Sequence, residues 1–119
     1  MFLDAEVENF ARTEMRNDLR VTKPRGQQYY PVIFPGFSWG NLQTNKDGGT
    51  AQEFNHTPRR GGNFLWRQFF SYYQEGVSGF YGAMFDEVDE GTAWYKVMSS
   101  RNDKNAADNS KAHLVYLGM

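Results

Sequence analysis

Apolar residues near the amino terminus recur at the spacing of one helix face. Within residues 2–16, where polar side chains fill the remaining positions, they are Leu3, Val7, Phe10, Ala11 and Met15. This spacing predicts an amphipathic helix with one buried side. The next stretch, residues 21–28, contains Pro24 and Gly26, which commonly stop a helix, and it therefore predicts a turn.

Two later segments are apolar throughout, without alternation. The first covers residues 29–34 and ends at Pro35, and the second covers residues 79–85. A continuous apolar run of this length is typical of a strand that is buried on both faces. We therefore predict two buried strands.

The region between the two predicted strands divides into a loop and a helix. Residues 40–62 are polar and have no periodicity, and a loop of this length is usually functional. Residues 63–76 return to helical spacing, with Asn63 as the expected N-cap and Gly76 as the expected stop. The helix is therefore predicted to connect the strands.

The predicted order of elements is the βα alternation of a parallel sheet. Both chemically rich segments follow the carboxyl end of a strand, where α/β folds place their sites. Two or three strands cannot close a barrel, which needs roughly 200 residues or more. We therefore expect residues 1–119 to be one partial catalytic domain, the C-terminal portion of a (β/α)8 TIM barrel, incomplete on its own. The alternative is a small complete α/β domain.

Composition excludes several classes of partner. The 13 basic and 14 acidic residues nearly cancel, and without a basic stripe nucleic acid is not expected. No apolar segment approaches the ~20 residues that cross a bilayer, so no membrane partner is expected. Absent cysteine excludes disulfides and thiolate metal sites. Aromatic residues, at 17%, offer ring faces for sugars, although core packing is the more general explanation for any one ring.

Four carboxylates follow the second predicted strand within five residues: Asp86, Glu87, Asp89 and Glu90. The three-residue spacing lets Glu87 and Glu90 converge if the chain makes a helical turn there. Two carboxylates held close repel, so that one pKa rises while the other stays low, as acid–base chemistry on a glycosidic bond requires. A solvated acidic loop or a helix start fits the same cluster.

No metal or cofactor is expected from the remaining motifs. Val88 breaks the acidic pattern of a calcium loop after Asp86, and Ala107 breaks the pattern that begins at Asp103. The two histidines have no partner at ligand spacing in the sequence, and no phosphate-binding glycine loop is present. The pair Arg59-Arg60 precedes two glycines and a helix, and fits either an anion site or, better, an arginine-anchored loop.

Three motifs carry a resemblance to a known family: YYPVIFPGFSWGNL, PRRGGNFLWRQ and GFYGAMFDEVDEGTAWYKV. Together they resemble the C-terminal part of the glycoside hydrolase family 71/99-like proteins, often described as xylosidases or arabinosidases. The relatives in family 99 are endo-α-mannosidases and endo-α-mannanases on a (β/α)8 barrel. The resemblance covers residues 29–98. One departure is Gly40, which stands where relatives often have a histidine.

The resemblance implies roles for the two glutamates. Glu87, Glu90, Gly91 and Thr92 match the E-x-x-E-G-T motif that carries the catalytic pair of family 99. Glu87 would be the base acting on the sugar 2-hydroxyl, giving a 1,2-anhydro-type intermediate with retention. Glu90 would be the general acid and later the base that activates water. The missing N-terminal half of the barrel is expected as a partner, and exported relatives favour a secreted or periplasmic protein.

Side chains near both predicted strand ends are expected to bind the sugar. These candidate residues are Phe37, Trp39, Asn41, Asp86, Asp89 and Trp94. The sugar itself stays open among mannoside, xyloside and arabinoside. Two other functions also stay open: a carbohydrate-binding module that does not hydrolyse its ligand, and a structural or interaction fragment without a ligand.

Overall fold

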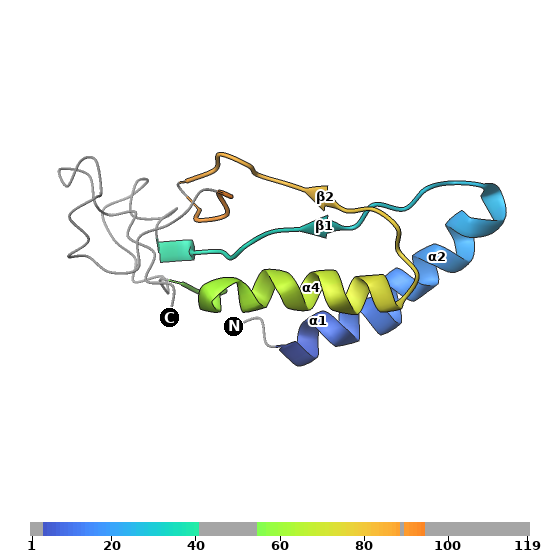
Figure 1. The fold of residues 1–119 in the computed structure, drawn as a ribbon, viewed down its shortest axis with the longest axis horizontal. Coiled ribbons are helices and arrows are strands. Elements are labelled where there is room, and N and C mark those ends of the chain that lie inside the picture. The colour runs from blue at the N-terminus through green and yellow to red at the C-terminus, as the bar shows by residue number, and fades with distance from the viewer. Residues whose placement is uncertain (1–3, 41–54, 89, 95–119) are drawn as a thin grey trace.

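The computed structural model describes residues 4–40, 55–88 and 90–94 of the chain. They form a small mixed domain in which the helices lie on one side of two short strands (Figure 1). The elements in chain order are α1 (Asp4–Phe10), a π-helix (Ala11–Met15), α2 (Arg16–Thr22), a 3₁₀ turn (Lys23–Arg25), β1 (Val32–Ile33), a second 3₁₀ turn (Arg60–Gly62), α4 (Asn63–Gln74) and β2 (Tyr81–Gly82).

The N-terminal helical segment is longer than the sequence predicted. It continues past residue 16 because Leu19, 6% exposed, extends the buried stripe. Pro24 does not stop it, since this residue lies in the first turn of the 3₁₀ segment, where a missing N–H is tolerated. Gly26, with a φ of 66°, follows the last turn and ends the segment as predicted.

The π-helix explains how buried residues four positions apart stay on one side. An α-helix has about 3.6 residues per turn, so a stripe repeating every four residues drifts around it. The wider π turn removes part of this drift between Ala11 and Met15, which are 1% and 0% exposed. Phe10, which the sequence placed on the buried side, is instead 39% exposed.

The two strands pair in parallel, as predicted. Val32 lies opposite Tyr81 and Ile33 opposite Gly82, and the Tyr81 N–H donates to the Pro31 carbonyl at 3.0 Å. Each strand is two residues long, shorter than the predicted runs. α4 crosses between them on the helical side (Figure 1), the connection that a parallel pair requires.

The two faces of the strand pair differ. Ile33 points toward the helices and is 2% exposed, whereas Val32 and Tyr81 on the opposite face are 48% and 61% exposed. The prediction of strands buried on both faces is therefore wrong in the described part of the chain, because the helices cover one face only. On the open face the Tyr30 ring lies against Gly79, where a Cβ would meet the ring at 1.9 Å.

The predicted connecting helix is confirmed with small corrections at its ends. α4 ends at Gln74, two residues before the predicted limit. Gly62, with a φ of 95°, precedes the helix as its N-cap, so Asn63 lies inside the helix and does not cap it. Gly76 has a φ of 86°, and its N–H donates to the Tyr73 carbonyl at 2.9 Å, which ends the helix as predicted.

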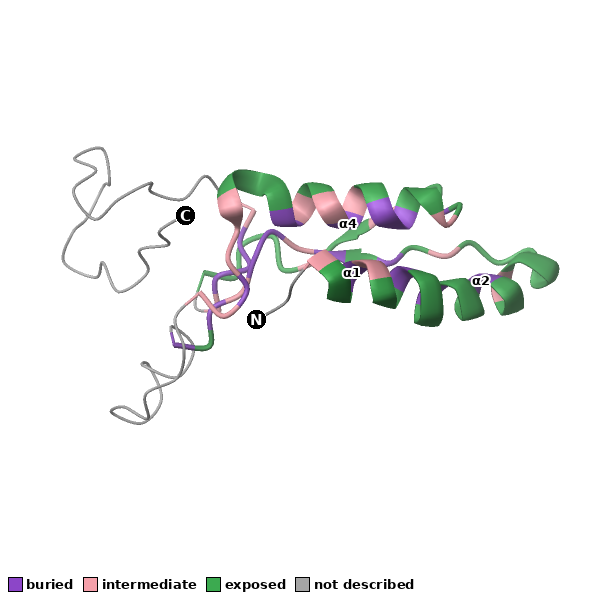
Figure 2. Ribbon diagram, turned by 90° about the horizontal axis from the view of Figure 1, so that it is seen from below, coloured by how far each residue is buried: buried purple, intermediate pink, exposed green. Residues whose placement is uncertain are grey.

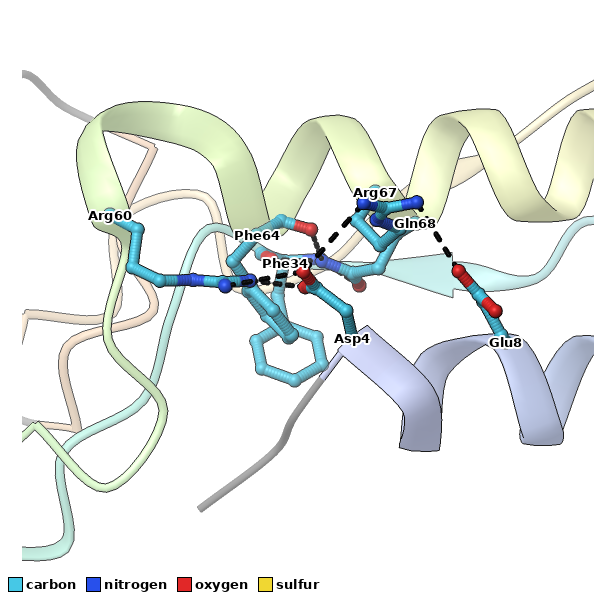
Figure 3. Close-up of polar contacts among 7 residues, drawn as sticks. All are labelled: Asp4, Glu8, Phe34, Arg60, Phe64, Arg67 and Gln68. Carbon is cyan, nitrogen blue, oxygen red and sulfur yellow. Dashed lines mark hydrogen bonds and ion pairs between the residues drawn. The ribbon is translucent and has the colours of Figure 1, made fainter.

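One side of α4 is buried between the N-terminal helical segment and the strands (Figure 2). On this side Gln68 is 1% exposed. Its amide makes the hydrogen bonds to the Phe34 backbone that a neighbouring strand would make. Its Oε1 accepts from the Phe34 N–H at 3.3 Å, and its Nε2 donates to the Phe34 carbonyl at 2.9 Å (Figure 3). One side chain therefore satisfies both backbone groups of the residue after β1.

Ion pairs align α1 with the beginning of α4 (Figure 3). Arg60 donates to Asp4, and Arg67 lies 3.2 Å from Glu8 and 3.7 Å from Asp4. The hydrogen bond from Arg60 holds the pKa of Asp4 below its usual value. Because these side chains are partly exposed, each pair stabilises little, about 1 kcal/mol or less, and mainly sets the orientation of the helices.

Candidate functional site

The acidic segment after β2 forms a loop whose two ends are tied together. The Trp94 N–H donates to the Phe85 carbonyl at 2.9 Å, and the Trp94 indole Nε1–H donates to the Ala83 carbonyl at 2.8 Å. The indole also lies against Gly82, where a Cβ would come within 3.0 Å of the ring. A surface loop of this size with adjacent ends is an Ω-loop, a type that is frequently functional.

Inside this loop the backbone makes two tight turns. The Glu87 N–H donates to the Met84 carbonyl at 3.3 Å, and the Gly91 N–H donates to the Val88 carbonyl at 3.2 Å. Positive φ angles at Met84 (59°) and Gly91 (79°) interrupt a helical path. The convergence of Glu87 and Glu90 stays a prediction, and the Ala93 N–H closes onto the Glu87 carbonyl at 2.9 Å.

The two glutamates have different surroundings. Glu90 is half-buried, and its Oε1 accepts a hydrogen bond from the buried Thr92 Oγ1 at 3.0 Å. Glu87 and Asp86 are exposed to solvent. A hydroxyl can donate to an ionised carboxylate and accept from a protonated one, so Thr92 can hold the Glu90 side chain in both states.

The exit of β1 lies directly against the acidic loop. The Ser38 N–H donates to the Glu90 carbonyl at 2.7 Å, and Ser38 is 1% exposed. On either side of it, the rings of Phe37 and Trp39 pack edge to face, with centroids 5.3 Å apart. Trp39 remains 40% exposed. The aromatic exit of β1 and the backbone of the glutamate segment therefore meet beyond the carboxyl ends of the two parallel strands.

A third segment, residues 55–57, is hydrogen-bonded to the exit of β1. Thr57 and Phe37 exchange two backbone hydrogen bonds of 2.9 Å each, and the Asn55 N–H donates to Ser38 Oγ at 3.0 Å. Gly36 allows this contact, because a Cβ there would lie 2.8 Å from the Thr57 carbonyl oxygen. The end of the long polar loop is thus attached to the β1 exit.

Arg59 connects this support to the acidic loop. Its guanidinium donates to the Gly91 carbonyl at 3.1 Å and to the Ala93 carbonyl. Of the two roles predicted for the Arg59-Arg60 pair, the structure supports the arginine-anchored loop, since Arg60 turns away to Asp4.

The structure brings together some of the predicted site residues. Phe37, Trp39 and Glu90 share one location, and Asp86 and Glu87 lie on the exposed part of the same loop. Trp94 closes the loop, and this contact occupies its indole N–H and part of its ring. Asn41 and Asp89 lie outside the described residues.

Sequence reasoning missed two residues of this location, Ser38 and Thr92, as structural contributors. Both are 1% exposed polar side chains, and each makes a hydrogen bond that shapes the glutamate segment. A signal was present for Thr92, which belongs to the E-x-x-E-G-T motif. Ser38 gave a weaker signal, as a single polar residue between two aromatic ones.

In the ranges 4–40, 55–88 and 90–94, no group of three histidine or carboxylate side chains is placed to hold a metal ion. Over those ranges there is also no helix with the length and apolar character needed to cross a membrane. Comparison of the chain with models of known protein families, with curated proteins and with solved structures found no match.

Proposed function

We propose that this chain is part of the catalytic domain of a retaining glycoside hydrolase, with Glu87 and Glu90 as its carboxylate pair. The observation that carries the proposal is the 2.7 Å hydrogen bond from the Ser38 N–H to the Glu90 carbonyl. It joins the aromatic exit of one parallel strand to the acidic loop after the other. Sugar sites combine these two elements, a ring face for the C–H surface and carboxylates for the hydroxyls and the glycosidic oxygen.

The proposed roles follow the E-x-x-E-G-T motif. Glu90 is the general acid that protonates the leaving oxygen and then, as a base, activates water. The Thr92 hydroxyl keeps the Glu90 side chain oriented through both protonation states. Glu87, in the exposed part of the loop, is the base toward the sugar 2-hydroxyl. The Phe37–Trp39 pair supplies the platform on which a sugar ring stacks.

The strand pair supports placing this chain in a larger (β/α)8 barrel. Its open face carries Tyr30, Val32 and Tyr81, which are 52%, 48% and 61% exposed. In a barrel such residues point inward and pack in layers with those of other strands. A groove of about 420 Å³, lined by apolar side chains that include Phe10 and Val32, borders β1, where a preceding strand and helix would pack.

A second function, carbohydrate binding without hydrolysis, is favoured by one observation. Trp39 is 40% exposed and packs edge to face against Phe37, and a sugar ring can stack on such an exposed indole without any carboxylate chemistry. The two functions predict the same ligand class and differ only in turnover.

A glycan array probed with the chain tests both functions together. We expect binding to oligosaccharides of mannose, xylose or arabinose, and loss of that binding in Trp39→Ala. The matched control is Trp66→Ala, which removes an exposed tryptophan of α4. If the chain binds none of these glycans, the binding module is wrong, and the hydrolase has to be tested in a protein that carries the whole barrel.

Turnover of an activated aryl glycoside then separates the two functions. By itself the chain is expected to be inactive or very weak, because most substrate contacts would come from other barrel strands. In a protein that carries the whole barrel, hydrolysis that is lost in Glu87→Gln supports the hydrolase. Binding that persists without any hydrolysis supports the binding module instead.

A further inference from the structure

Thr92 lies between two acceptors that belong to different parts of the acidic loop. Its Oγ1 is 3.0 Å from Glu90 Oε1 and 3.4 Å from the Glu87 carbonyl oxygen. The residue is 1% exposed, so its hydroxyl has little access to bulk water. A hydroxyl has one hydrogen to donate and can accept a bond from another donor. Because 3.4 Å is long for a hydroxyl bond, the hydrogen goes to Glu90 whenever that side chain is ionised.

The backbone on both sides of Thr92 is fixed by contacts that do not involve its hydroxyl. Arg59 donates to the Gly91 carbonyl at 3.1 Å and to the Ala93 carbonyl. The Ala93 N–H donates to the Glu87 carbonyl at 2.9 Å, and this bond keeps the carbonyl beside the segment that carries Thr92. The hydroxyl can therefore change the direction in which it donates by rotation about its Cβ–Oγ1 bond, without movement of the main chain.

A proton on Glu90 Oε1 reverses the direction of its hydrogen bond with Thr92. The protonated carboxyl is itself a donor, and the Thr92 oxygen can accept from it. The hydroxyl hydrogen then has the Glu87 carbonyl as its remaining acceptor among the residues that the structure describes. Two hydrogen bonds in series thus run from Glu90 through Thr92 to Glu87. One proton passes from solvent to Glu90, the hydroxyl hydrogen stays on Thr92, and no covalent bond of the threonine breaks.

Other titratable groups lie on the segments around Glu90, and a measurement has to distinguish them from it. Those that the structure describes are Asp86 and Glu87 in the loop, His56 and Arg59 in residues 55–59, and Tyr81 on β2. The Asp86 and Glu87 side chains are exposed, and the Arg59 guanidinium donates to backbone carbonyls. The described hydrogen bond to a loop carboxylate from Thr92 is made to Glu90. A response that passes through the hydroxyl therefore reports on Glu90.

We propose that Thr92 is a positioning residue that transmits the protonation state of Glu90 to the backbone of the segment that carries Glu87. With Glu90 ionised, the Glu87 carbonyl accepts from the Ala93 N–H. With Glu90 protonated, it gains the Thr92 hydroxyl as a second donor, which polarises the peptide group between Glu87 and Val88. This relay through the hydroxyl needs no substrate. Its consequence for catalysis, that the segment of the base responds to the charge of the acid, rests on the proposed function.

A pH titration of the isotope-labelled full chain, followed by nuclear magnetic resonance, tests the relay. In the wild-type chain the Glu87 carbonyl carbon should move downfield with the same midpoint as the Glu90 carboxyl carbon, because both signals report the proton on Glu90. This movement should be lost in Thr92→Val, which keeps the shape of threonine and lacks the hydroxyl. It should return in Thr92→Ser, which restores the hydroxyl.

The matched control is Thr57→Val, which removes the hydroxyl of another buried threonine. Thr57 is 2% exposed, and its bonds to Phe37 are made by its backbone, so the movement of the Glu87 carbonyl should be unchanged in this variant. Two results would overturn the proposal. One is a movement that persists in Thr92→Val, and the other is a movement that follows only the carboxyl carbons of Asp86 and Glu87.

A second measurement at pH 7 does not require the fold to survive acid. Glu90→Ala removes the preferred acceptor, so the Thr92 hydroxyl should turn to the Glu87 carbonyl and move its carbon signal downfield. In a Thr92→Val background the same substitution should have no such effect, because the double-mutant cycle cancels changes that do not pass through the hydroxyl. Equal movement in both backgrounds, or none in the wild-type background, would contradict the relay. Neither measurement involves turnover, so failure of the relay and failure of the glycosidase proposal are distinguishable.

Discussion

At the scale of single residues, Gln68 shows how much the fold depends on one polar side chain. It is 1% exposed and bonds to the N–H and carbonyl of Phe34 and to the Phe64 carbonyl at 3.2 Å. An apolar residue of the same size would leave the Phe34 N–H and carbonyl without this partner. A partner removed from a buried polar group costs more than a hydrogen bond normally contributes.

Gln68→Leu should therefore lower the free energy of unfolding by about 2–4 kcal/mol. The measurement is urea unfolding followed by circular dichroism. Gln74→Leu, an exposed glutamine of the same helix, is the matched control and should change stability by less than about 0.5 kcal/mol. Equal effects of the two substitutions would show that the Phe34 contacts are not what holds α4 to the strand exit.

The two glutamates are predicted to differ in their dependence on the leaving group. In a protein with the complete barrel, Glu90→Gln should reduce turnover by roughly 10²- to 10⁴-fold, and less for substrates whose leaving group needs no proton. Glu87→Gln should be severe for every substrate, since the loss of the proposed 2-hydroxyl base does not depend on the leaving group. Asp86→Asn is the control with a small effect. If it alone abolished hydrolysis, the catalytic pair would have to be sought among the aspartates.

Tyr72 makes stability depend on alkaline pH. Burial raises the pKa of Tyr72 to about 12, whereas a tyrosine in an unfolded chain titrates near ~10. The folded state therefore holds the phenol proton more tightly than the unfolded state does. The contribution of Tyr72 to the free energy of unfolding is complete below pH ~10 and is lost as the pH rises toward ~12. Burial, followed by a hydrogen bond to Asp18, also raises the pKa of Tyr29 to about 12, and it adds to the same loss.

Tyr72→Phe should remove part of this dependence. Between pH 9 and 12, we expect the wild-type chain to lose about 1–2 kcal/mol more unfolding free energy than the variant does. Thermal melts at a series of pH values measure the difference. At pH 7 the two proteins should differ little. Parallel curves over the whole range would rule out the buried phenol as the cause.

At the scale of elements, the acidic loop is held by Arg59 in addition to its own hydrogen bonds. Arg59→Ala removes the donor to the Gly91 and Ala93 carbonyls, and we expect the Ala93 and Trp94 amides to exchange at least tenfold faster. Amide exchange in α4 should stay unchanged. Arg67→Ala is the control, because that arginine pairs with α1 and does not reach the loop. Unchanged exchange at Ala93 in Arg59→Ala would mean that other contacts position the loop.

Local patterns predicted the elements better than their ends. α4 was predictable because its spacing, its preceding glycines and Gly76 all agree, and the parallel strand pair followed from the order of the elements. The N-terminal helix exceeded its predicted end because a π turn keeps a four-residue stripe buried, and no local rule anticipates that turn. Strand length was overestimated, since apolar runs such as residues 79–85 include turn and loop positions.

Contacts within the candidate site were less predictable. The spacing of Glu87 and Glu90 gave no sign of the two tight turns, of the positive φ at Met84 and Gly91, or of the anchor from Arg59. The hydrogen bond from Ser38 to Glu90 joins distant parts of the chain, and the spacing of residues along the sequence cannot predict such a contact. What could be anticipated was the shared location, because both segments follow the carboxyl ends of parallel strands.

At the scale of the whole molecule, two apolar grooves flank the strand pair. One borders β1 and is lined in part by Phe10 and Val32, and the other borders β2 and is lined in part by Trp66 and Phe80. The described residues thus leave an apolar groove beside each of the two strands.

The anchoring of the acidic loop has a consequence for the order in which the protein folds. The Arg59–Gly91 bond closes 32 residues of chain, whereas each turn of the α1–α2 segment forms between near neighbours. Contacts between distant residues must offset the entropy of closing a long loop, so they form late and open early. On heating, the fluorescence of Trp39 and Trp94 should change several degrees before the helical circular dichroism signal does. Coincident transitions would show instead that the loop and the helices unfold as one unit.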